Sequence, residues 1–210
     1  MKKVRVGILD YGVGNIKSIY NALKIVGFEV IIIQGSLKSE RYDVLILPGV
    51  GSFNVAIDNL NNSGLVQELN IEAIDRRRPI LGICLGMQLM ATTSSENGIN
   101  CGLNWIKGKV IKIPDNLLPI PHVGWNNIKF TSEEPMFERV IYNNHFYFDH
   151  SYYFSCDNIE NIKAEVDYGI KLPCIIQDEN ILGFQFHPEK SHNNGLKLLK
   201  DCVNKMSEYA

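Results

Sequence analysis

The sequence predicts an α/β fold in which helices flank an open, mostly parallel sheet, with an antiparallel β insertion in the second half. In the first half, short apolar runs alternate with segments of helical periodicity, which is typical of βαβ units and of parallel sheets covered on both faces. After about residue 100, apolar runs follow one another with little helix between them. The 210 residues, 45% of them hydrophobic, can form one globular core, so we expect a single domain over 1–210.

In the first half, the strands and helices are predicted from the spacing of apolar residues and from the residues that interrupt it. Strands are predicted at 4–9, 30–33, 44–47 and 79–83, and helices at 16–26, 55–60 and 65–74. The first helix has apolar residues on one face and ends at Gly27, a natural C-terminal stop. Helices between successive strands place those strands side by side and parallel.

The second half is predicted to be mainly antiparallel. Strands are expected at 109–113, 127–130, 145–154, 163–166, 174–177 and 181–186, followed by a closing helix at 194–206. Asp178, Glu179 and Asn180 form a plausible hairpin turn between the last two strands. No repeat, low-complexity tract or linker divides the chain.

Composition excludes several classes of function. The formal net charge of -2 gives no global attraction to nucleic acid or to an anionic membrane, and the basic run at 76–78 is typical of a solvated helix end. The five cysteines include no Cys-x-x-Cys pair, so neither a disulfide framework nor a zinc site is expected. No apolar run reaches the roughly 18 residues that span a bilayer, and the sequence shows no signal-peptide h-region. We therefore expect a cytoplasmic protein.

The first candidate site residue is Cys84. A short apolar run leads into the motif Gly-Ile-Cys-Leu-Gly at 82–86, and a helix-compatible segment, 87–91, follows. This layout is typical of a nucleophile elbow, a tight strand-to-helix turn that exposes a side chain. Glycines allow the two backbones to pass closely, and the start of a helix favours a thiolate. The alternative is a buried structural cysteine.

A second group of candidates lies about 100 residues later, where a predicted strand ends in His187 and Glu189 follows across Pro188. Pro188 restricts the backbone of His187, so the turn holds the imidazole and the carboxylate in a fixed position relative to each other. A nucleophilic thiol needs a base, and the base needs an orienting acceptor. Because sites gather at the carboxyl ends of strands in open α/β sheets, the two groups are expected to meet there. Taken singly, His187 is better explained as a satisfied histidine and Glu189 as a solvated carboxylate.

Together these motifs resemble the signatures of class I glutamine amidotransferases, which use a Cys-His-Glu triad. The resemblance rests on Gly-Ile-Cys-Leu-Gly-Met-Gln at 82–88 and Phe-His-Pro-Glu-Lys-Ser at 186–191. Within that family, the segments at 10–15, 47–53, 121–126 and 148–153 resemble the glutaminase subunits of imidazole glycerol phosphate synthases. The similarity spans essentially the whole chain, and it implies a flavodoxin-like glutaminase fold that needs no cofactor and no metal.

The resemblance also implies roles for residues. Cys84 would attack the side-chain amide of L-glutamine, His187 would move the proton, and Glu189 would hold the imidazole. A glutamyl thioester would form and be hydrolysed to glutamate. The remaining implied site residues are an oxyanion hole from Leu85 with Val50 or Gly51, and glutamine-binding positions at Gln88, His150, Ser151 and Tyr152. On composition alone, residues 48–51 are a strand-ending turn.

Subunits of this kind dock on a synthase, because ammonia released into water is protonated and no longer nucleophilic. The implied partner is a cyclase subunit of (β/α)₈ fold, in a heterodimer that closes an imidazole ring in histidine biosynthesis. Residues that match the docking face are Asn15, Trp125, Asn126 and Lys190. For Trp125, a core indole with a bonded N–H is an alternative.

Two departures from the family pattern leave alternatives open. Asp149 stands where an apolar residue is more usual and could change the charge near the site. Segments 191–195 and 102–106 look more like paralogues that supply ammonia to amidate a surface-polysaccharide sugar. A non-catalytic binding or regulatory partner is an alternative of another class, although packing alone does not require Cys84, His187 and Glu189 together.

Overall fold

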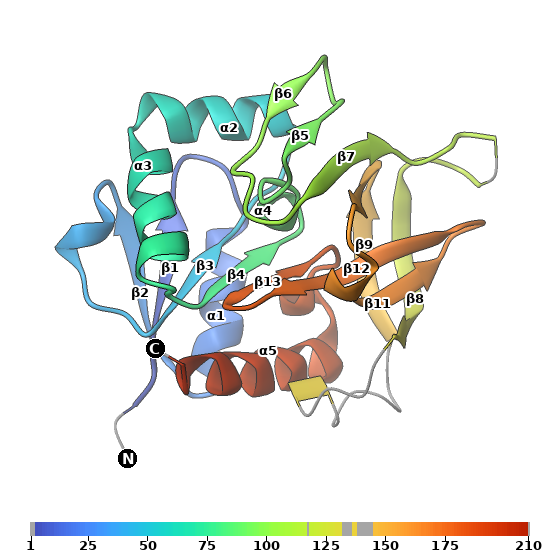
Figure 1. Cartoon of the computed structure of the whole chain (residues 1–210). Helices are drawn as coiled ribbons and strands as arrows, with labels where there is room; N and C mark the ends of the chain where they lie inside the picture. The colour runs from blue at the N-terminus through green and yellow to red at the C-terminus, as the bar shows by residue number, and fades with distance from the viewer. Residues whose placement is uncertain (1–2, 117, 132–135, 138–144, 210) are drawn as a thin grey trace.

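A twisted sheet runs through the computed structural model, which describes residues 3–116, 118–131, 136–137 and 145–209 (Figure 1). In the described residues it has nine strands in the order β2-β1-β3-β4-β13-β12-β11-β8-β9. These are β1 (Arg5–Asp10), β2 (Glu29–Gln34), β3 (Val44–Leu47), β4 (Ile80–Ile83), β8 (His122–Phe130), β9 (His145–His150), β11 (Ile162–Asp167), β12 (Lys171–Asp178) and β13 (Ile181–Phe184). Strands β2, β1, β3, β4 and β13 are parallel, and the strands beyond β13 pair antiparallel.

A second, smaller sheet lies beside the first, in the order β10-β7-β5-β6. Its strands are β5 (Thr93–Ser94), β6 (Asn100–Cys101), β7 (Gly108–Lys112) and β10 (Tyr152–Cys156). Figure 1 shows it above β4 and β13, next to α2. The helices are α1 (Ile16–Ile25), α2 (Phe53–Asn62), α3 (Leu65–Asn70), α4 (Leu85–Gln88) and α5 (His192–Ser207), with short turns η1 (Leu37–Ser39), η2 (Ile71–Asp75), η4 (Ile159–Asn161) and η5 (Pro188–Lys190).

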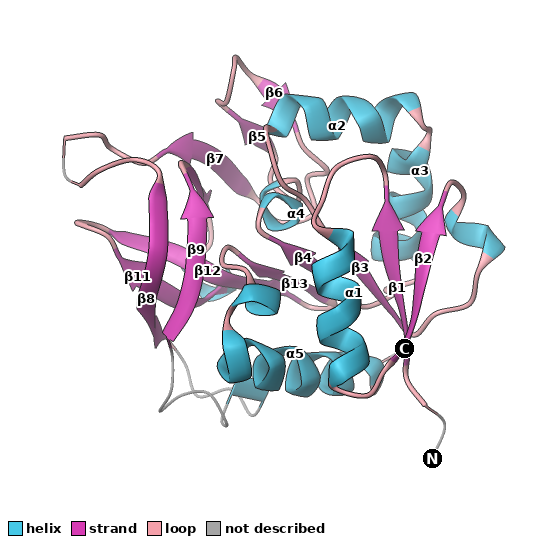
Figure 2. Ribbon diagram, turned by 180° about the vertical axis from the view of Figure 1, so that it is seen from behind, coloured by secondary structure: helices cyan, strands magenta, loops and turns pink. Residues whose placement is uncertain are grey.

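The parallel strands separate two apolar cores. Val6 and Ile8 of β1 face the core formed with α1 and α5, whereas Leu9 faces the core formed with α2, α3 and the small sheet. Side chains alternate across a strand, so burial on both faces requires the continuous apolar runs seen in the sequence. Figure 2 views the molecule from the side of α1 and α5. The predicted α/β fold class is confirmed.

Several predicted boundaries differ from the structure. The predicted strand at 145–154 is two strands, because the chain leaves the large sheet at Ser151: His150 pairs with β8, while Tyr152 pairs with β7. Strand β8 begins at His122 rather than 127, and α5 begins at His192 rather than 194. The two-residue strands β5 and β6 were not predicted, since they are too short to show a period.

The helix after Cys84 starts earlier and is shorter than the predicted 87–91. It ends at Gln88 because the amides of residues 103–105 bond the carbonyls of residues 89–91 at 2.8 to 3.0 Å. Those carbonyls lie in the turn that follows α4, and they accept hydrogen bonds from the segment at 103–105. A helix of this length has only a small dipole, so the predicted contribution of the helix to a thiolate is weak.

The basic run at 76–78 is also more than a solvated helix end. Arg76 and Arg78 both form ion pairs with Glu72, whose side chain is buried, and Arg78 lies over the ring of Tyr42. Arg77, the most exposed of the three, pairs with Glu179. Over the described residues, no helix combines the length and the hydropathy that a membrane span requires.

Both ends of the described chain lie at the amino edge of the parallel strands. Lys3 stands two residues before β1, and Tyr209 lines a hollow together with Pro79, which precedes β4. Figure 1 marks the two termini close to this edge. Cys84, by contrast, follows the carboxyl end of β4.

Candidate functional site

Cys84 occupies a strained turn between β4 and α4. Its φ of 54° and ψ of -110° lie outside the regions that side-chain-bearing residues ordinarily adopt. A Cβ at Gly86 would lie 1.8 Å from the carbonyl oxygen of Leu47, and one at Gly82 would lie 2.7 Å from Gly86. The two glycines therefore allow the close passage of strand and helix that holds the cysteine at the edge of the sheet.

Strand β13 brings the second half of the chain to the same place. It pairs parallel to β4 with Phe184 opposite Ile83, and the amide of Cys84 donates to the carbonyl of Phe184 at 2.7 Å. Three residues after that pairing ends, His187 is almost fully buried, and its Nδ1 lies 2.9 Å from Oε1 of Glu189. The side chain of Glu189 is also fully buried.

The electrostatics couple the three side chains. Burial alone lowers the pKa of the His187 imidazole, but hydrogen bonds to Cys84 and to Glu189, with the negative charges of both, outweigh it and raise the pKa to about 10. A proton is therefore favoured on the imidazole when the cysteine is a thiolate. The structure thus brings together the three residues for which the sequence predicts catalytic roles.

A cavity of about 290 Å³ opens beside the sulfur. It is lined by Val50, Gly51, Cys84, Leu85, Gln88, Glu96, Pro121, Asp149, His150, Ser151, Tyr152, His187 and Lys190. All predicted oxyanion and glutamine-binding residues lie in this lining, and so does the unusual Asp149. Larger hollows, of about 640 and 750 Å³, lie away from Cys84 and are lined by other residues.

The loop after β3 is held close to the cysteine. The Tyr11 hydroxyl donates to the carbonyl of Pro48 at 2.6 Å, and burial followed by the charge of Cys84 raises the pKa of that hydroxyl above its usual range. Gly51 has a φ of +97°, which favours glycine. These contacts fix the loop that carries Val50 and Gly51 at the rim of the cavity.

Four residues that the sequence analysis does not assign belong to this region. They are Tyr11, Glu96, His122 and Gln185. Glu96 lines the cavity and accepts from the amide of Phe53 at 2.9 Å, while Gln185 donates to the Cys84 sulfur at 3.9 Å. The sequence does contain a signal that could have identified Gln185, because it is a polar residue between two phenylalanines in an apolar run. Glu96 has none, since it comes from the loop between β5 and β6.

The predicted docking residues are only partly brought together. Trp125 is 40% exposed and stacks on His192 with ring centroids 4.7 Å apart, so the alternative of a core indole is wrong. Trp125 also meets Tyr147, over whose ring the Lys190 ammonium lies. Helix α1, which follows Asn15, contacts η5, which carries Lys190. Asn126 instead bonds the carbonyl of Asp167.

Two buried histidines lie at the cavity, His150 in its lining and His122 behind His150. Burial is the main cause that lowers the pKa of His150 to about 3 and that of His122 to about 4. Both imidazoles are therefore neutral at pH 7 in the folded protein, whereas in the unfolded chain they titrate near pH 6.5.

We expect acidification to destabilise the protein through these two groups. A histidine with a lowered pKa makes its full contribution to the free energy of unfolding above about pH 6.5. That contribution declines as the pH falls toward the pKa of the histidine in the folded protein, because the unfolded chain binds the proton first. Between pH 7 and about pH 4.5, the free energy of unfolding should fall less in His122→Asn than in the wild type, by about 2 kcal/mol. Urea unfolding of both proteins at both pH values measures this, and equal declines would contradict it.

Comparisons with known proteins bear on the family and the fold of the chain. A sequence model described as glutamine amidotransferase class-I matches residues 7–206. The imidazole glycerol phosphate synthase subunit HisH of Leptospira interrogans is 41% identical over 203 residues, covering 95% of this chain and 99% of the relative. The subunit of the same name from Archaeoglobus fulgidus is 43% identical over 199 residues, covering 95% and 98%. The structure of PurLQS from Thermotoga maritima aligns with a TM-score of 0.73 at 18% identity over 97% of this chain and 99% of that one, which supports the fold alone.

Proposed function

Because the chain belongs to the class-I glutamine amidotransferase family, we propose that it is the glutaminase subunit of an imidazole glycerol phosphate synthase. It would hydrolyse L-glutamine to glutamate and pass ammonia to a cyclase subunit in histidine biosynthesis. The observation that carries this proposal is the contact of His187 with both Cys84 and Glu189 beside a cavity. We further propose that residues 1–210 act as one glutamine amidotransferase domain in the cytoplasm, without cofactor or metal.

In the proposed mechanism, the Cys84 thiolate attacks the carbonyl carbon of the glutamine amide and forms a C–S bond. Amides of Leu85 and of Val50 or Gly51 stabilise the oxyanion, a contribution of roughly 3–4 kcal/mol for each donor. The His187 imidazolium then gives its proton to the departing nitrogen, and ammonia leaves as the C–N bond breaks. The product of this half-reaction is a glutamyl thioester.

The second half-reaction regenerates the enzyme. Neutral His187 takes a proton from water as the water attacks the thioester carbonyl, and glutamate and the Cys84 thiolate are released. Glu189 keeps the Nδ1 proton of His187 in place, so that Nε2 is the atom that exchanges protons with the reactants.

A free amino acid suits the lining of the cavity. Lys190 can face a carboxylate and Glu96 can face an ammonium group, while the predicted glutamine-binding residues Gln88, Ser151 and Tyr152 supply hydrogen bonds. This charge arrangement supports a zwitterionic substrate rather than a peptide or a nucleic acid.

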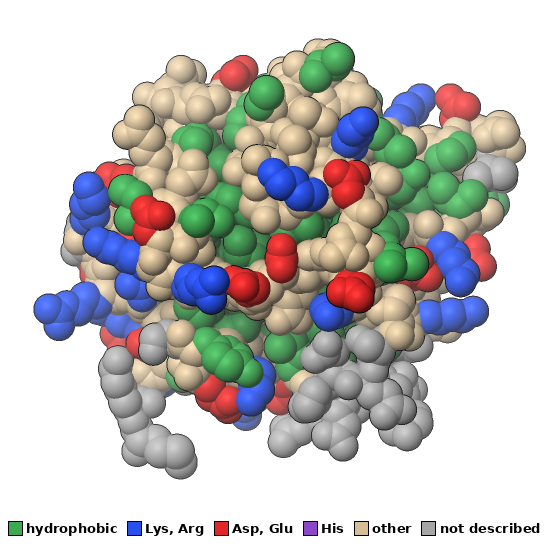
Figure 3. Space-filling model, viewed as in Figure 1, with side chains coloured by type: hydrophobic (Ala, Val, Ile, Leu, Met, Phe, Trp, Pro, Cys, Tyr) green, Lys and Arg blue, Asp and Glu red, His purple; other side chains and the backbone are tan. Residues whose placement is uncertain are grey.

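We propose that the surface around Trp125 docks on a (β/α)₈ cyclase subunit in a heterodimer. Trp125 is accompanied there by Val123, which is 53% exposed, and Val50 lies exposed at the rim of the cavity. Aromatic residues of this kind often dominate interface energetics. On the face seen in Figure 3, basic and acidic side chains are interspersed, so charge does not single out another docking region there.

We expect Trp125→Ala to weaken binding of the cyclase subunit by at least about 30-fold, because truncation of an interface anchor typically costs about 2 kcal/mol or more. The measurement is a titration of glutaminase activity against cyclase concentration. Ile25→Ala is the matched control, since Ile25 is an exposed apolar residue at the far end of α1. Equal affinities of the two variants would contradict the proposed docking surface.

The same assay tests the proposed function. Glutamate release should rise when the cyclase subunit and its phosphoribosyl-formimino ligand are added. Activation only by a sugar-amidating synthase would favour the polysaccharide alternative. Failure to release glutamate with either partner, in a folded protein, would favour the non-catalytic alternative.

A further inference from the structure

A chain of buried hydrogen bonds begins at the sulfur of Cys84. Gln185, which is fully buried, approaches this sulfur with Nε2 at 3.9 Å. Its Oε1 accepts from Nε2 of Gln88 at 3.0 Å. The orientation of the Gln185 amide is therefore set, because its oxygen must face Gln88 and its nitrogen must face the sulfur.

The chain continues to the carbonyl of Tyr152 in the wall of the cavity. This oxygen accepts from Nε2 of Gln88 and lies near Nδ1 of His150, both at 2.9 Å. A carbonyl oxygen has two lone pairs and no proton, so each neighbour has to donate. His150 must therefore carry its proton on Nδ1.

The next link is His122, whose Nδ1 lies 3.0 Å from Nε2 of His150. His150 is neutral, since its pKa of about 3 leaves it unprotonated at pH 7, and its one proton is on Nδ1. Its Nε2 is then a lone pair that needs a donor, and the donor is the Nδ1–H of His122. The two bonds thus fix the tautomers of both histidines.

The ring of His122 is itself held in place. It stacks on Phe148 and on Tyr168, with centroids 4.7 and 4.0 Å away, in a site where His122 is 3% exposed. His150 lines the cavity beside His187, and a positive charge on His187 disfavours one on His150. A neutral His150 therefore suits a site whose working base becomes an imidazolium.

We propose that His122 is a positioning residue for the glutaminase reaction. Its Nδ1–H donates a hydrogen bond to His150 and so fixes the carbonyl of Tyr152 and the amide of Gln88 beside the nucleophile. The reaction itself rests on the function proposed above, whereas the tautomer assignment does not. His122 is not itself among the residues that line the cavity, so it acts through His150, which is one of them.

The test compares His122→Phe with His122→Asn in the complex with the cyclase subunit. Phenylalanine keeps the ring stack but has no donor, while Nδ2 of asparagine lies as many bonds from the backbone as Nδ1 of histidine. We expect His122→Phe to raise the KM for glutamine about tenfold, the effect of losing one buried hydrogen bond, with kcat changed less than about threefold. His122→Asn should recover most of the affinity.

Tyr168→Phe is the matched control, because it removes one hydrogen bond, to the carbonyl of Pro119, and keeps its ring against His122. Its KM should stay within about twofold of the wild type. A KM in His122→Phe no higher than that of Tyr168→Phe, or no recovery in His122→Asn, would overturn the positioning role.

An imidazole ¹⁵N spectrum of the histidine-labelled protein gives a readout that needs no activity. In the wild type, His150 should be the Nδ1–H tautomer and remain neutral from about pH 5 to 8. In His122→Phe its Nε2 resonance should shift, because that nitrogen loses its donor. An Nε2–H tautomer in the wild type would overturn the inference. Absence of glutaminase activity in the wild type would instead overturn the proposed function.

Discussion

Cys84→Ala is expected to lower the kcat/KM for glutamine hydrolysis by at least about 10⁴-fold, because it removes the atom that forms the covalent bond. The structure leaves no other thiol beside the described cavity, since Cys84 is the one cysteine in its lining. Glutamate release by the complex with the cyclase subunit measures the effect.

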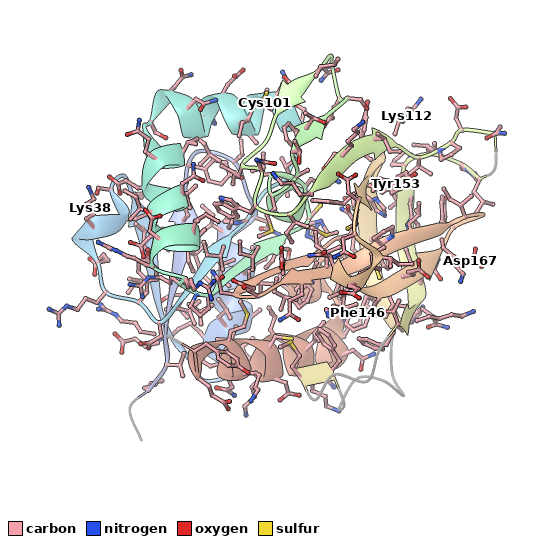
Figure 4. The ribbon with its side chains drawn as sticks, in the orientation of Figure 1. Lys38, Cys101, Lys112, Phe146, Tyr153 and Asp167 are labelled. Atoms are coloured by element: carbon pink, nitrogen blue, oxygen red, sulfur yellow. The ribbon has the colours of Figure 1, made fainter. Side chains whose placement is uncertain are left out.

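Two controls separate lost chemistry from lost structure. Cys84→Ala should leave cyclase activity intact when ammonium salts replace glutamine, because exogenous ammonia bypasses the thioester. Cys101→Ala should keep the wild-type rate, since Cys101 is exposed on β6, away from the cavity (Figure 4). Wild-type hydrolysis by Cys84→Ala would refute the assignment of the nucleophile.

Gly86→Ala is expected to destabilise the protein by more than about 3 kcal/mol, or to prevent folding. Its Cβ would lie 1.8 Å from the carbonyl oxygen of Leu47 and 3.3 Å from the carbonyl carbon of Pro48. These are backbone atoms of β3 and of the loop after it, so no side-chain rotation relieves the clash. Urea unfolding gives the change in the free energy of unfolding.

Gly64→Ala is the matched control for this substitution. Gly64 has a φ of +71° and no atom within 4 Å of its would-be Cβ, so alanine there meets backbone strain alone, worth about 1 kcal/mol. Similar losses in the free energy of unfolding for Gly64→Ala and Gly86→Ala would show that the close contact with β3 is not what requires glycine at position 86.

The parallel half of the fold is predictable because burial on both faces leaves a direct trace in the sequence. Strand β3 is buried along its whole length and coincides with the predicted run at 44–47. The hairpin at residues 178–181 also forms as predicted, with Asp178 opposite Ile181. In each case the local pattern and the tertiary environment require the same residues.

The antiparallel half is less predictable, because its boundaries depend on contacts between distant segments. Nothing local shows that the chain changes sheets at Ser151, and the exposed residues of β8 hide its first five positions from an apolar pattern. Likewise, the length of α4 is set by amides more than ten residues later. The ion pairs of Glu72 arise in the same way, since burial of that carboxylate cannot be read from its neighbours.

Site residues that stand in short motifs are also predictable, whereas those that depend on distant partners are not. Cys84, His187 and Glu189 stand in short motifs with clear chemistry, and their roles stay predictions until the variants are measured. His122 and Gln185 act through side chains about 30 and 100 residues away, at His150 and Gln88. A pairing of this kind leaves no mark on the residues around either partner, so only the coordinates reveal it.

The position of Lys3 and Tyr209 at the amino edge of the parallel strands bears on how the protein can be handled. A tether or fluorescent label fused at either end would emerge on the side of the sheet opposite the nucleophile. The protein could then be immobilised or labelled for binding measurements while the surface around Trp125 stays unobstructed.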